Sequence, residues 1–363
     1  MTKFDTIAIP AGAMPQGTSK VERVAPRIAD DATLLRIAAE LNREFSVASP
    51  SLYWTDFLAS TLLGYAGLTG AILLDNAALA VASGLVAMLA LYRAASFIHE
   101  LTHIRKGALP GFRVAWNALV GVPLMIPSFM YEGVHTLHHA RTRYGTANDP
   151  EYLPLALMKP WSLPLFVVVA MLAPVGLILR FGLMTPLSVL IPPFRRVVEA
   201  QYSALSINPA FRRRPPEGEF KRQWYAQEAG ACLFAMALVG SVFVFGWRPL
   251  LTYMAVHSAM TVINQLRTLV AHLWENEGEA MTVTAQYLDS VNVPPPSYLA
   301  PIWAPVGLRY HALHHLLPSV PYHALGKAHQ RMVAALEIQP VYSRANYRGM
   351  MPLVAKIARS TMR

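Results

Sequence analysis

The sequence predicts an all-α integral membrane protein: two transmembrane helical hairpins (about four spans), interfacial or re-entrant helices, and a cytoplasmic helical cap. Of its 363 residues, 54% are hydrophobic and only 14% are charged, whereas about 25% are charged in an ordinary soluble domain. Several apolar stretches approach the roughly 20 residues that a spanning helix needs. Histidine clusters lie beside these stretches, and we expect the cap to carry them.

The chain begins with a polar to amphipathic segment, residues 1–48, which we expect to be a cytoplasmic N-terminal arm. Residues 31–44 predict a surface helix within it, because three apolar residues recur at helical spacing: Leu34, Ala38 and Leu41. Asp30 or Asp31 is suited to cap the start of this helix.

The first predicted hairpin consists of Tyr53–Leu74 and Ala77–Ile98, which only Asp75 and Asn76 separate. Basic residues lie before the first span and after the second, so both outer ends are expected in the cytoplasm. Those after the second span are Arg105, Lys106 and Arg113.

A second hairpin is predicted from Ala229–Phe245 and Leu250–Ala271, again with arginines before it. The net charge of +10 fits cytoplasmic loops and contact with anionic lipids, and we expect no nucleic-acid partner. The chain has a single cysteine, Cys232, which excludes a disulfide framework, a cysteine-based zinc site and an iron–sulfur cluster.

Two further apolar stretches, Val114–Met130 and Leu163–Ile191, are interrupted by prolines, and the second also contains Arg180. If all the histidines are to share one site, an even number of crossings must separate successive clusters. The first stretch then fits an interfacial or re-entrant segment. The second fits a re-entrant hairpin broken near Pro174, or an interfacial helix pair.

No further span follows residue 275, and the chain ends in basic residues. We therefore divide the sequence into the N-terminal arm, a membrane domain at residues 49–335 and a basic C-terminal tail at residues 336–363.

Nine histidines form three clusters and one outlier. They are His99-Glu-Leu-Thr-His103, His135-Thr-Leu-His138-His139, His311-Ala-Leu-His314-His315, and the separate His272. Spacings of three and four place the members of each cluster on one helical face. Neutral imidazole binds divalent iron, zinc and copper. One ion uses three or four protein ligands, so nine imidazoles suit two ions.

Other polar residues near the clusters have two interpretations each. Asp149 could accept a hydrogen bond from the second nitrogen of a ligand imidazole, or simply end a loop. Asn264 could face a metal through water, or bond to a neighbouring helix. Arg267 could pair with an anionic group or anchor its helix at the interface. His257, in the middle of the last span, is interpreted as a histidine with its hydrogen bonds satisfied.

The first cluster is also a literal His-Glu-x-x-His motif, which is typical of zinc peptidases with Glu100 as the general base. In a peptidase the six histidines of the other two clusters would have no role. This interpretation is therefore the weaker one.

The order of these motifs resembles the membrane fatty acid desaturase superfamily, the integral-membrane di-iron group that also includes lipid hydroxylases and carotenoid ketolases. The match rests on HELTH, HTLHH followed by Asn-Asp-Pro, NQLRTLVAH and HALHH, with hydrophobic hairpins between them, over about residues 50–330. The segment around the last cluster is similar to bacterial acyl-lipid desaturases. Three residues, rather than the four usual in acyl-CoA desaturases, separate His99 and His103, which leaves the carrier of the acyl chain open.

The resemblance implies that the nine histidines bind two iron ions, with Asn264 as a water-mediated ligand. It implies an O2-dependent desaturase that introduces a double bond into the fatty acyl chain of a lipid, in a multi-pass protein of the bacterial inner membrane with a cytoplasmic active site. Electrons must come from outside the chain, so we expect a small carrier such as a ferredoxin. A basic surface could attract it: Arg105, Lys106, Arg212, Arg213 and Arg214.

Two alternatives to desaturation stay open. A lipid hydroxylase or ketolase would use the same di-iron scaffold, and the sequence does not separate it from a desaturase. A non-catalytic metal-binding or transport protein would have polar residues along its spans. Here the polar residues gather at one membrane face instead.

Overall fold

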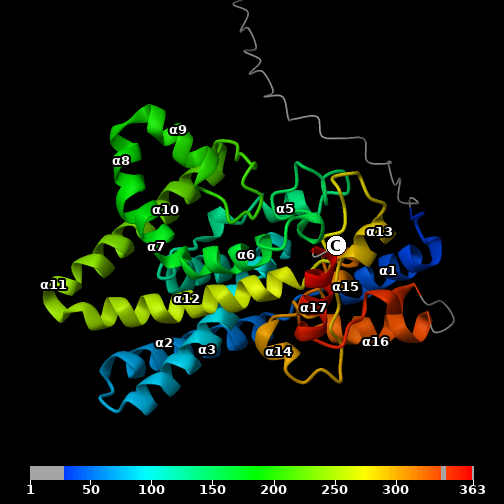
Figure 1. Ribbon diagram of the computed structural model, residues 1–363, viewed down its shortest axis with the longest axis horizontal. Helices are drawn as coiled ribbons and strands as arrows, with labels where there is room; N and C mark the ends of the chain where they lie inside the picture. The colour runs from blue at the N-terminus through cyan, green and yellow to red at the C-terminus, as the bar shows by residue number, and fades with distance from the viewer. Residues whose placement is uncertain (1–27, 337–340, 362–363) are drawn as a thin grey trace, which may run out of the picture.

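The computed structural model describes residues 28–336 and 341–361, which form helices, turns and isolated β-bridges. Residues 1–27 of the predicted arm, and residues 337–340 and 362–363 of the predicted tail, lie outside this part. Figure 1 shows long helices on one side of the molecule and a cluster of short helices and loops on the other. Long apolar helices and clustered histidines confirm the predicted all-α membrane fold.

The first hairpin consists of α2 (Pro50–Leu73) and α3 (Ala77–His103). The two helices approach closely, because a Cβ atom on Gly67 would lie 2.8 Å from the Ser83 carbonyl oxygen and 2.8 Å from the Ala87 nitrogen. Small residues permit such contacts between membrane helices. The predicted hairpin is therefore present, and α3 continues past the predicted span end to His103.

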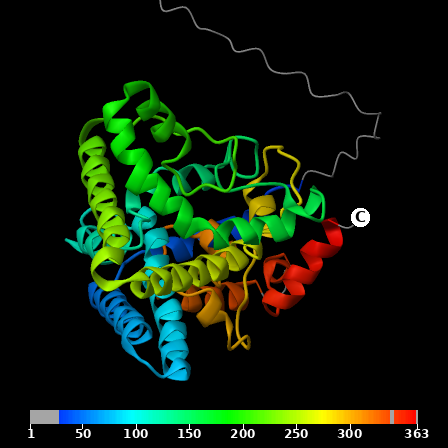
Figure 2. The ribbon, with the colours of Figure 1, turned by 60° about the vertical axis from the view of Figure 1, so that its left-hand side comes forward.

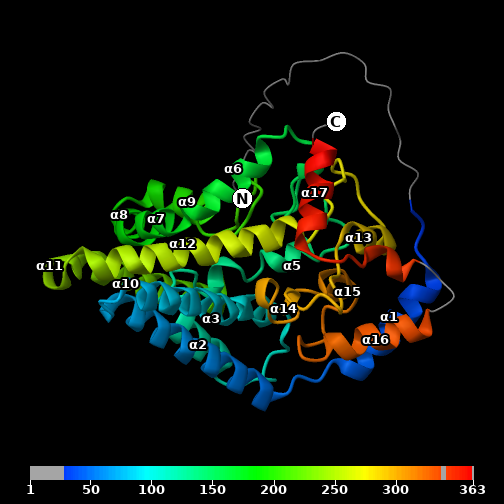
Figure 3. The same ribbon diagram turned by 60° about the horizontal axis from the view of Figure 1, so that its bottom comes forward.

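The second hairpin runs from α10 (Gly218–Gly240) through α11 (Val242–Phe245) into α12 (Trp247–Leu269), and α12 passes alongside α3 (Figures 1 and 3). Four stretches are long and apolar enough to cross a membrane, namely Pro50–Leu73, Ala77–His103, Ala173–Leu190 and Gly218–Phe245. The stretch that contains α12 was predicted as a span but does not meet this measure. Its polar residues are the reason: they include Arg248, His257, Asn264 and Arg267.

Residues 112–130 form a short broken segment. Its elements are α4 (Phe112–Trp116), the π-helical turn η1 (Asn117–Gly121) and the 3₁₀ turn η2 (Ser128–Met130). Two carbonyl groups that the broken helix leaves free accept hydrogen bonds from tyrosines of the hairpins. Tyr65 donates to Leu119 at 2.6 Å, and Tyr253 donates to Pro123 at 2.8 Å. Such partners are what an irregular backbone at membrane depth requires.

The predicted second interrupted stretch becomes a chain of helices, which are α6 (Ser162–Met171), α7 (Ala173–Ile178), the π-helical turn η4 (Leu179–Met184), α8 (Thr185–Leu190) and α9 (Pro192–Gln201). The backbone nitrogens of Ile207 and Asn208 both donate to the Pro150 carbonyl at 3.0 Å. The two ends of residues 151–206 therefore meet at Pro150, on one side of the membrane. The segment between them must then cross the membrane an even number of times.

The break after α6 lies at the middle of α12. Ser258 donates to the Met171 carbonyl at 2.8 Å, and Thr261 donates to the Ala170 carbonyl at 2.7 Å. No second stretch among residues 151–206 can cross back, because α6 has ten residues and would be about 15 Å long, and α9 contains three charged residues. These contacts favour the re-entrant alternative, although Ala173–Leu190 alone is long and apolar enough to cross, and the topology of this segment stays a prediction.

A buried ionic network fixes this segment to the second hairpin. Arg180 of η4 and Arg195 of α9 both donate to the Glu228 carboxylate on α10, at 2.5 and 2.6 Å. Arg180 also donates to Thr185 and Ser203. Its Nε atom donates to the Tyr202 carbonyl, so each of the three guanidinium nitrogens has a partner and the arginine can lie within an apolar helix.

The remaining helices form a cap around the end of α3 and α12. They are α1 (Ala32–Phe45), α5 (His135–His138), η3 (Leu155–Leu157), α13 (Val283–Asp289), α14 (Ala300–Trp303), α15 (His311–Leu316), α16 (Leu325–Ala335), η5 (Tyr342–Ala345) and α17 (Met350–Thr361).

Both ends of the described chain pack onto this cap. The Asp31 side chain caps α1 by accepting from two backbone nitrogens, and the predicted apolar face of α1 is buried beside α16. At the other end, α17 packs against η3 and buries Ile357. Figure 2 shows α17, in red, across the molecule from the α2–α3 hairpin.

Candidate metal centre

The structure brings all nine predicted histidines together from four separate parts of the chain. His99 and His103 occupy the last turns of α3. His135 and His138 lie on α5 and His139 directly follows it, whereas the three histidines of the last cluster lie on α15. His272 lies just beyond α12. The histidines form two groups, and the available ligand atoms of each group lie within 4.8 Å of one another. The groups are His99, His103, His135, His139 and His314, and then His138, His272, His311 and His315.

Local backbone structure sets the direction of each ring. His99 and His103 are four residues apart on a regular helix, so both side chains project from one face. The short helices α5 and α15 each form little more than one turn, which brings their own histidines side by side. His272 is held by an isolated antiparallel bridge to Ser290.

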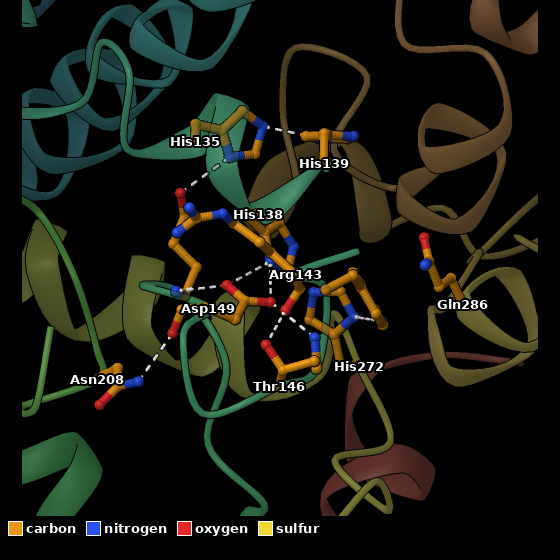
Figure 4. Close-up of polar contacts among 12 residues, drawn as sticks. His135, His138, His139, Arg143, Thr146, Asp149, Asn208, His272 and Gln286 are labelled. Carbon is orange, nitrogen blue, oxygen red and sulfur yellow. Dashed lines mark hydrogen bonds and ion pairs between the residues drawn. The ribbon is translucent and has the colours of Figure 1, made fainter. Parts of the chain in front are cut away.

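Asp149 orients His138. The two carboxylate oxygens lie 3.0 and 2.9 Å from His138 Nδ1, and both residues are buried (Figure 4). Backbone nitrogens of Gly145 and Glu151 donate to the same carboxylate at 2.8 and 2.9 Å. Asp149 therefore accepts from Nδ1, as the sequence suggested, and leaves the Nε2 lone pair free to bind a metal.

A second carboxylate serves His135. Glu151 Oε1 lies 3.0 Å from His135 Nδ1. The Tyr131 hydroxyl lies 2.8 Å from the same nitrogen and donates to the other Glu151 oxygen. Burial raises the pKa of Glu151 to about 7. Glu151 was not predicted as a partner of a histidine, although it stands two residues after Asp149.

His272 has a longer set of partners. Its Nδ1 lies 2.8 Å from the Tyr144 hydroxyl and 3.3 Å from the Ser290 hydroxyl. Tyr144 in turn donates to the Asp289 carboxylate at 2.8 Å. Because that hydrogen is used, the Tyr144 oxygen is free to accept from His272 Nδ1. No local motif marks these residues, which come from distant parts of the chain.

The Nε2 atoms face one another across each group. The separation is 3.0 Å for His135 and His139 and for His272 and His311, and 3.2 Å for His139 and His314 and for His311 and His315. With Nδ1 hydrogen-bonded to an oxygen, the Nε2 atoms of His135 and His272 present lone pairs. The Nε2 atom of His139 faces two of these atoms, those of His135 and His314, but carries at most one hydrogen.

Several buried imidazole nitrogens also lack any hydrogen-bond partner within the described residues, namely Nδ1 and Nε2 of His99, Nε2 of His103, and Nδ1 of His311 and His314. Unpaired buried nitrogens are costly. Converging lone pairs and orphaned nitrogens together fit a metal ion in each group.

Burial keeps the imidazoles neutral, which is the form that binds metals. Burial, followed by the charges of neighbouring histidines, holds the pKa of His139, His314 and His315 well below the usual value. His138 differs: burial lowers its pKa, but the Asp149 charge and hydrogen bond raise it overall.

Two expectations need correction. His257 was expected to have its hydrogen bonds satisfied, but both of its ring nitrogens are buried without a partner among the described residues. Arg213 was expected on an exposed basic surface. It is buried, and it donates to the Ser203 and Glu132 carbonyls at 2.6 Å each.

Glu100 has a different place from the one that a zinc peptidase requires. One oxygen of its buried carboxylate accepts from the Tyr53 hydroxyl and from the Tyr322 backbone nitrogen. Its carboxylate thus joins α3 to α2 and to the loop before α16. This position argues against the general base of a peptidase.

Asn264 contacts Arg267 in the structure. Its Oδ1 atom accepts from Arg267 Nη2 at 3.3 Å, so the amide is engaged one helical turn away on α12. A water-mediated contact between Asn264 and a metal stays a prediction.

Over most of its length, the chain is similar in sequence to known proteins. The model of the fatty acid desaturase family matches residues 76–345. A ceramide hydroxylase from Caulobacter vibrioides (strain NA1000 / CB15N) is 47% identical over 335 residues, which cover 92% of this chain and 95% of the relative. No solved structure matches. The family match spans every histidine of both groups, and the chain is therefore a member of the fatty acid desaturase family, an integral-membrane, multi-pass oxidoreductase that acts on lipids.

Proposed function

We propose that the protein hydroxylates a ceramide-like lipid at a di-iron centre, with O2 as co-substrate. The observation that carries this proposal is the 47% identity to a ceramide hydroxylase over almost the whole chain. It favours the hydroxylase alternative over the desaturation that the sequence analysis put first. The family name alone would favour desaturation.

The two histidine groups divide the proposed iron ligands. Five imidazoles would hold one ion and four would hold the other. Two bound irons would supply the activation of O2 that a methylene group requires. The balanced reaction is the insertion of one oxygen atom into a C–H bond, with the second oxygen leaving as water after uptake of two electrons and two protons.

The residues of the chain hold this centre in position. Asp149, Glu151 and the Tyr144–Asp289 pair fix the tautomers of His138, His135 and His272 and so aim each Nε2 inward. Most of the histidines are buried, which keeps bulk water away from most of the proposed ligands. Three ligands, His103, His139 and His315, are only partly buried.

The two electrons would come from a small soluble carrier protein such as a ferredoxin, because the chain has only one cysteine and so no iron–sulfur cluster of its own. We propose a cytoplasmic location for the centre and a bacterial inner membrane for the protein. Exposed cations follow α3 at Arg105 and Lys106, as the positive-inside rule requires of a cytoplasmic face.

The test is mass spectrometry of lipids from cells that express the protein and are supplied with ceramide. We expect a ceramide with one additional oxygen atom, absent in His138→Ala and present in His323→Ala, a histidine outside both groups. A ceramide or fatty acyl chain with a new double bond and no added oxygen would contradict hydroxylation and restore desaturation.

A further inference from the structure

One arginine beside the histidine groups has no ionic partner. Arg267 lies in the last turn of α12, five residues before His272. Its Nη2 atom donates to Asn264 at a long 3.3 Å, and the side chain lies beside the Tyr92 hydroxyl of α3. Its Nε atom is buried without any partner in the described part of the chain.

Four other buried or partly buried arginines are paired with carboxylates, namely Arg93 with Asp56, Arg113 with Glu132, and Arg180 and Arg195 with Glu228. The buried Arg213 donates to two backbone carbonyls instead. A charge near the apolar region of a membrane protein is costly unless it has a partner. No carboxylate of the residues described here lies within ion-pair distance of Arg267, so an acceptor from outside the chain is the simplest partner.

The place of Arg267 indicates what that acceptor is. The residue belongs to α12 and its side chain lies beside the Tyr92 hydroxyl of α3, so the guanidinium lies between these two helices. Arg267 stands in the last turn of α12, five residues before His272, which belongs to the group with His138, His311 and His315. A molecule that reaches Arg267 from the lipid phase would therefore lie next to the group that contains His272.

We infer that Arg267, steadied by Asn264, binds the polar group of the lipid substrate through the amide carbonyl of a ceramide. This inference rests on the proposed function and adds a specificity-determining residue to it. A guanidinium presents several donors in a fixed plane, and a carbonyl oxygen accepts them well. Arg267 is a binding and positioning residue and takes no part in bond cleavage.

The assignment has a consequence for the position of oxidation. If the amide is bound beside His272, the carbon that reacts lies only a few bonds from the polar group. Oxidation in the middle of an acyl chain would instead place the polar group far from the histidines. We therefore expect the new hydroxyl close to the amide, on either of the two chains of the ceramide.

The experiment measures binding and turnover separately in the purified, iron-loaded protein. A short-chain fluorescent ceramide is the binding probe, and an alkane of matched carbon number is the probe without an amide. We expect Arg267→Met to raise the Kd and the KM for ceramide by about 10- to 100-fold, as the loss of a charge-assisted hydrogen bond predicts. Alkane binding and iron content should not change, and Arg267→Lys should restore part of the affinity.

The matched control is Arg248→Met, at the opposite end of α12, which should bind ceramide like the wild type. Unchanged ceramide binding in Arg267→Met would overturn the inference. So would a loss of iron together with binding of both probes, since that indicates a structural role. Tighter Arg267-dependent binding of a free fatty acid than of ceramide would overturn the choice of an amide.

The proposed function can fail independently of this inference. If the wild type binds ceramide through Arg267 but forms no hydroxylated product, the binding site stands and the activity is wrong. If it hydroxylates ceramide far from the amide and Arg267→Met does so equally well, the activity stands and the role of Arg267 is wrong.

Discussion

The carboxylate of Asp149 lies 2.9 Å from Nδ1 of His138, and neither side chain is more than 1% exposed. This contact fixes the tautomer of His138 and leaves its Nε2 lone pair free to bind a metal ion. Glu151 has the same relation to His135 in the other histidine group. Two neighbouring carboxylates thus serve the two groups separately, which makes the groups separable by experiment.

The first prediction concerns iron content. Asp149→Asn would weaken iron binding by about 10- to 100-fold, as is typical when the partner of a ligand imidazole is lost. The loss should affect the group that contains His138, so the purified variant should retain about half of the wild-type iron by elemental analysis.

The exposed neighbour Asn148 supplies the control, and Asn148→Ala should bind iron like the wild type. Glu151→Gln should reduce the iron of the other group. Full iron occupancy in both carboxylate variants would show that these carboxylates do not orient ligands.

The second prediction concerns topology and uses single cysteines in a Cys232→Ala background. A membrane-impermeant maleimide should label cysteines at positions 159 and 214 from the same side as one at 106, because residues 151–206 return to Pro150. A cysteine at position 75, in the turn between α2 and α3, should be labelled from the opposite side. Labelling of positions 159 and 214 from opposite sides would mean that residues 173–190 cross the membrane.

The third prediction concerns the ionic network of the re-entrant segment. Glu228→Ala would leave Arg180 and Arg195 without their shared carboxylate. Breaking a buried ion pair costs about 3–5 kcal/mol, so the unfolding temperature in detergent should fall clearly. Glu217→Ala, at an exposed site just before α10, should unfold like the wild type. An unchanged unfolding temperature in Glu228→Ala would exclude a role of the network in stability.

The fourth prediction concerns pH and His329 of α16, which is buried and lies outside the histidine groups. Burial, followed by the charge of Arg309, lowers its pKa to about 4, and its Nδ1 lies 2.7 Å from the Tyr342 hydroxyl. Between pH 6.5 and about 4 the unfolded chain binds a proton at this histidine that the folded chain does not. Folding stability should therefore fall as the pH falls, by up to roughly 1.4 kcal/mol per pH unit.

The measurement is thermal unfolding of the wild type and of His329→Gln across this pH range. Both proteins contain the same metal ligands, so the titration of these ligands cancels in the difference between the two curves. His329→Gln should lose stability less steeply than the wild type, and the exposed-site variant Gln330→Ala should follow the wild type. Parallel curves for His329→Gln and the wild type would exclude His329 as a source of pH dependence.

Local spacing made much of the fold and of the candidate site predictable. Histidines three and four residues apart must share a helical face, and Asp149 lies close enough along the chain to His138 to be proposed as its partner. The need for one shared site also predicted that residues 163–191 return to the side from which they enter. The hydrogen bonds from Ile207 and Asn208 to Pro150 agree with this.

Other features depend on contacts between distant segments, which spacing does not encode. Tyr144 and Asp289 meet at His272 although 145 residues separate them. Arg213 was expected at the surface because it stands in a run of arginines, yet the fold supplies two carbonyl acceptors that bury it. The choice between hydroxylation and desaturation depends on the placement of one methylene group, and only the comparison with a hydroxylase favours one of them.

The most direct test of the proposed reaction is the origin of the oxygen in the product. Purified iron-loaded protein, a reduced ferredoxin and ceramide would react under O2 labelled with a heavy oxygen isotope. We predict a hydroxylated ceramide that carries one labelled oxygen atom and is not formed by His138→Ala. A product with a new double bond and no label would contradict hydroxylation, as would a hydroxyl group whose oxygen comes from water.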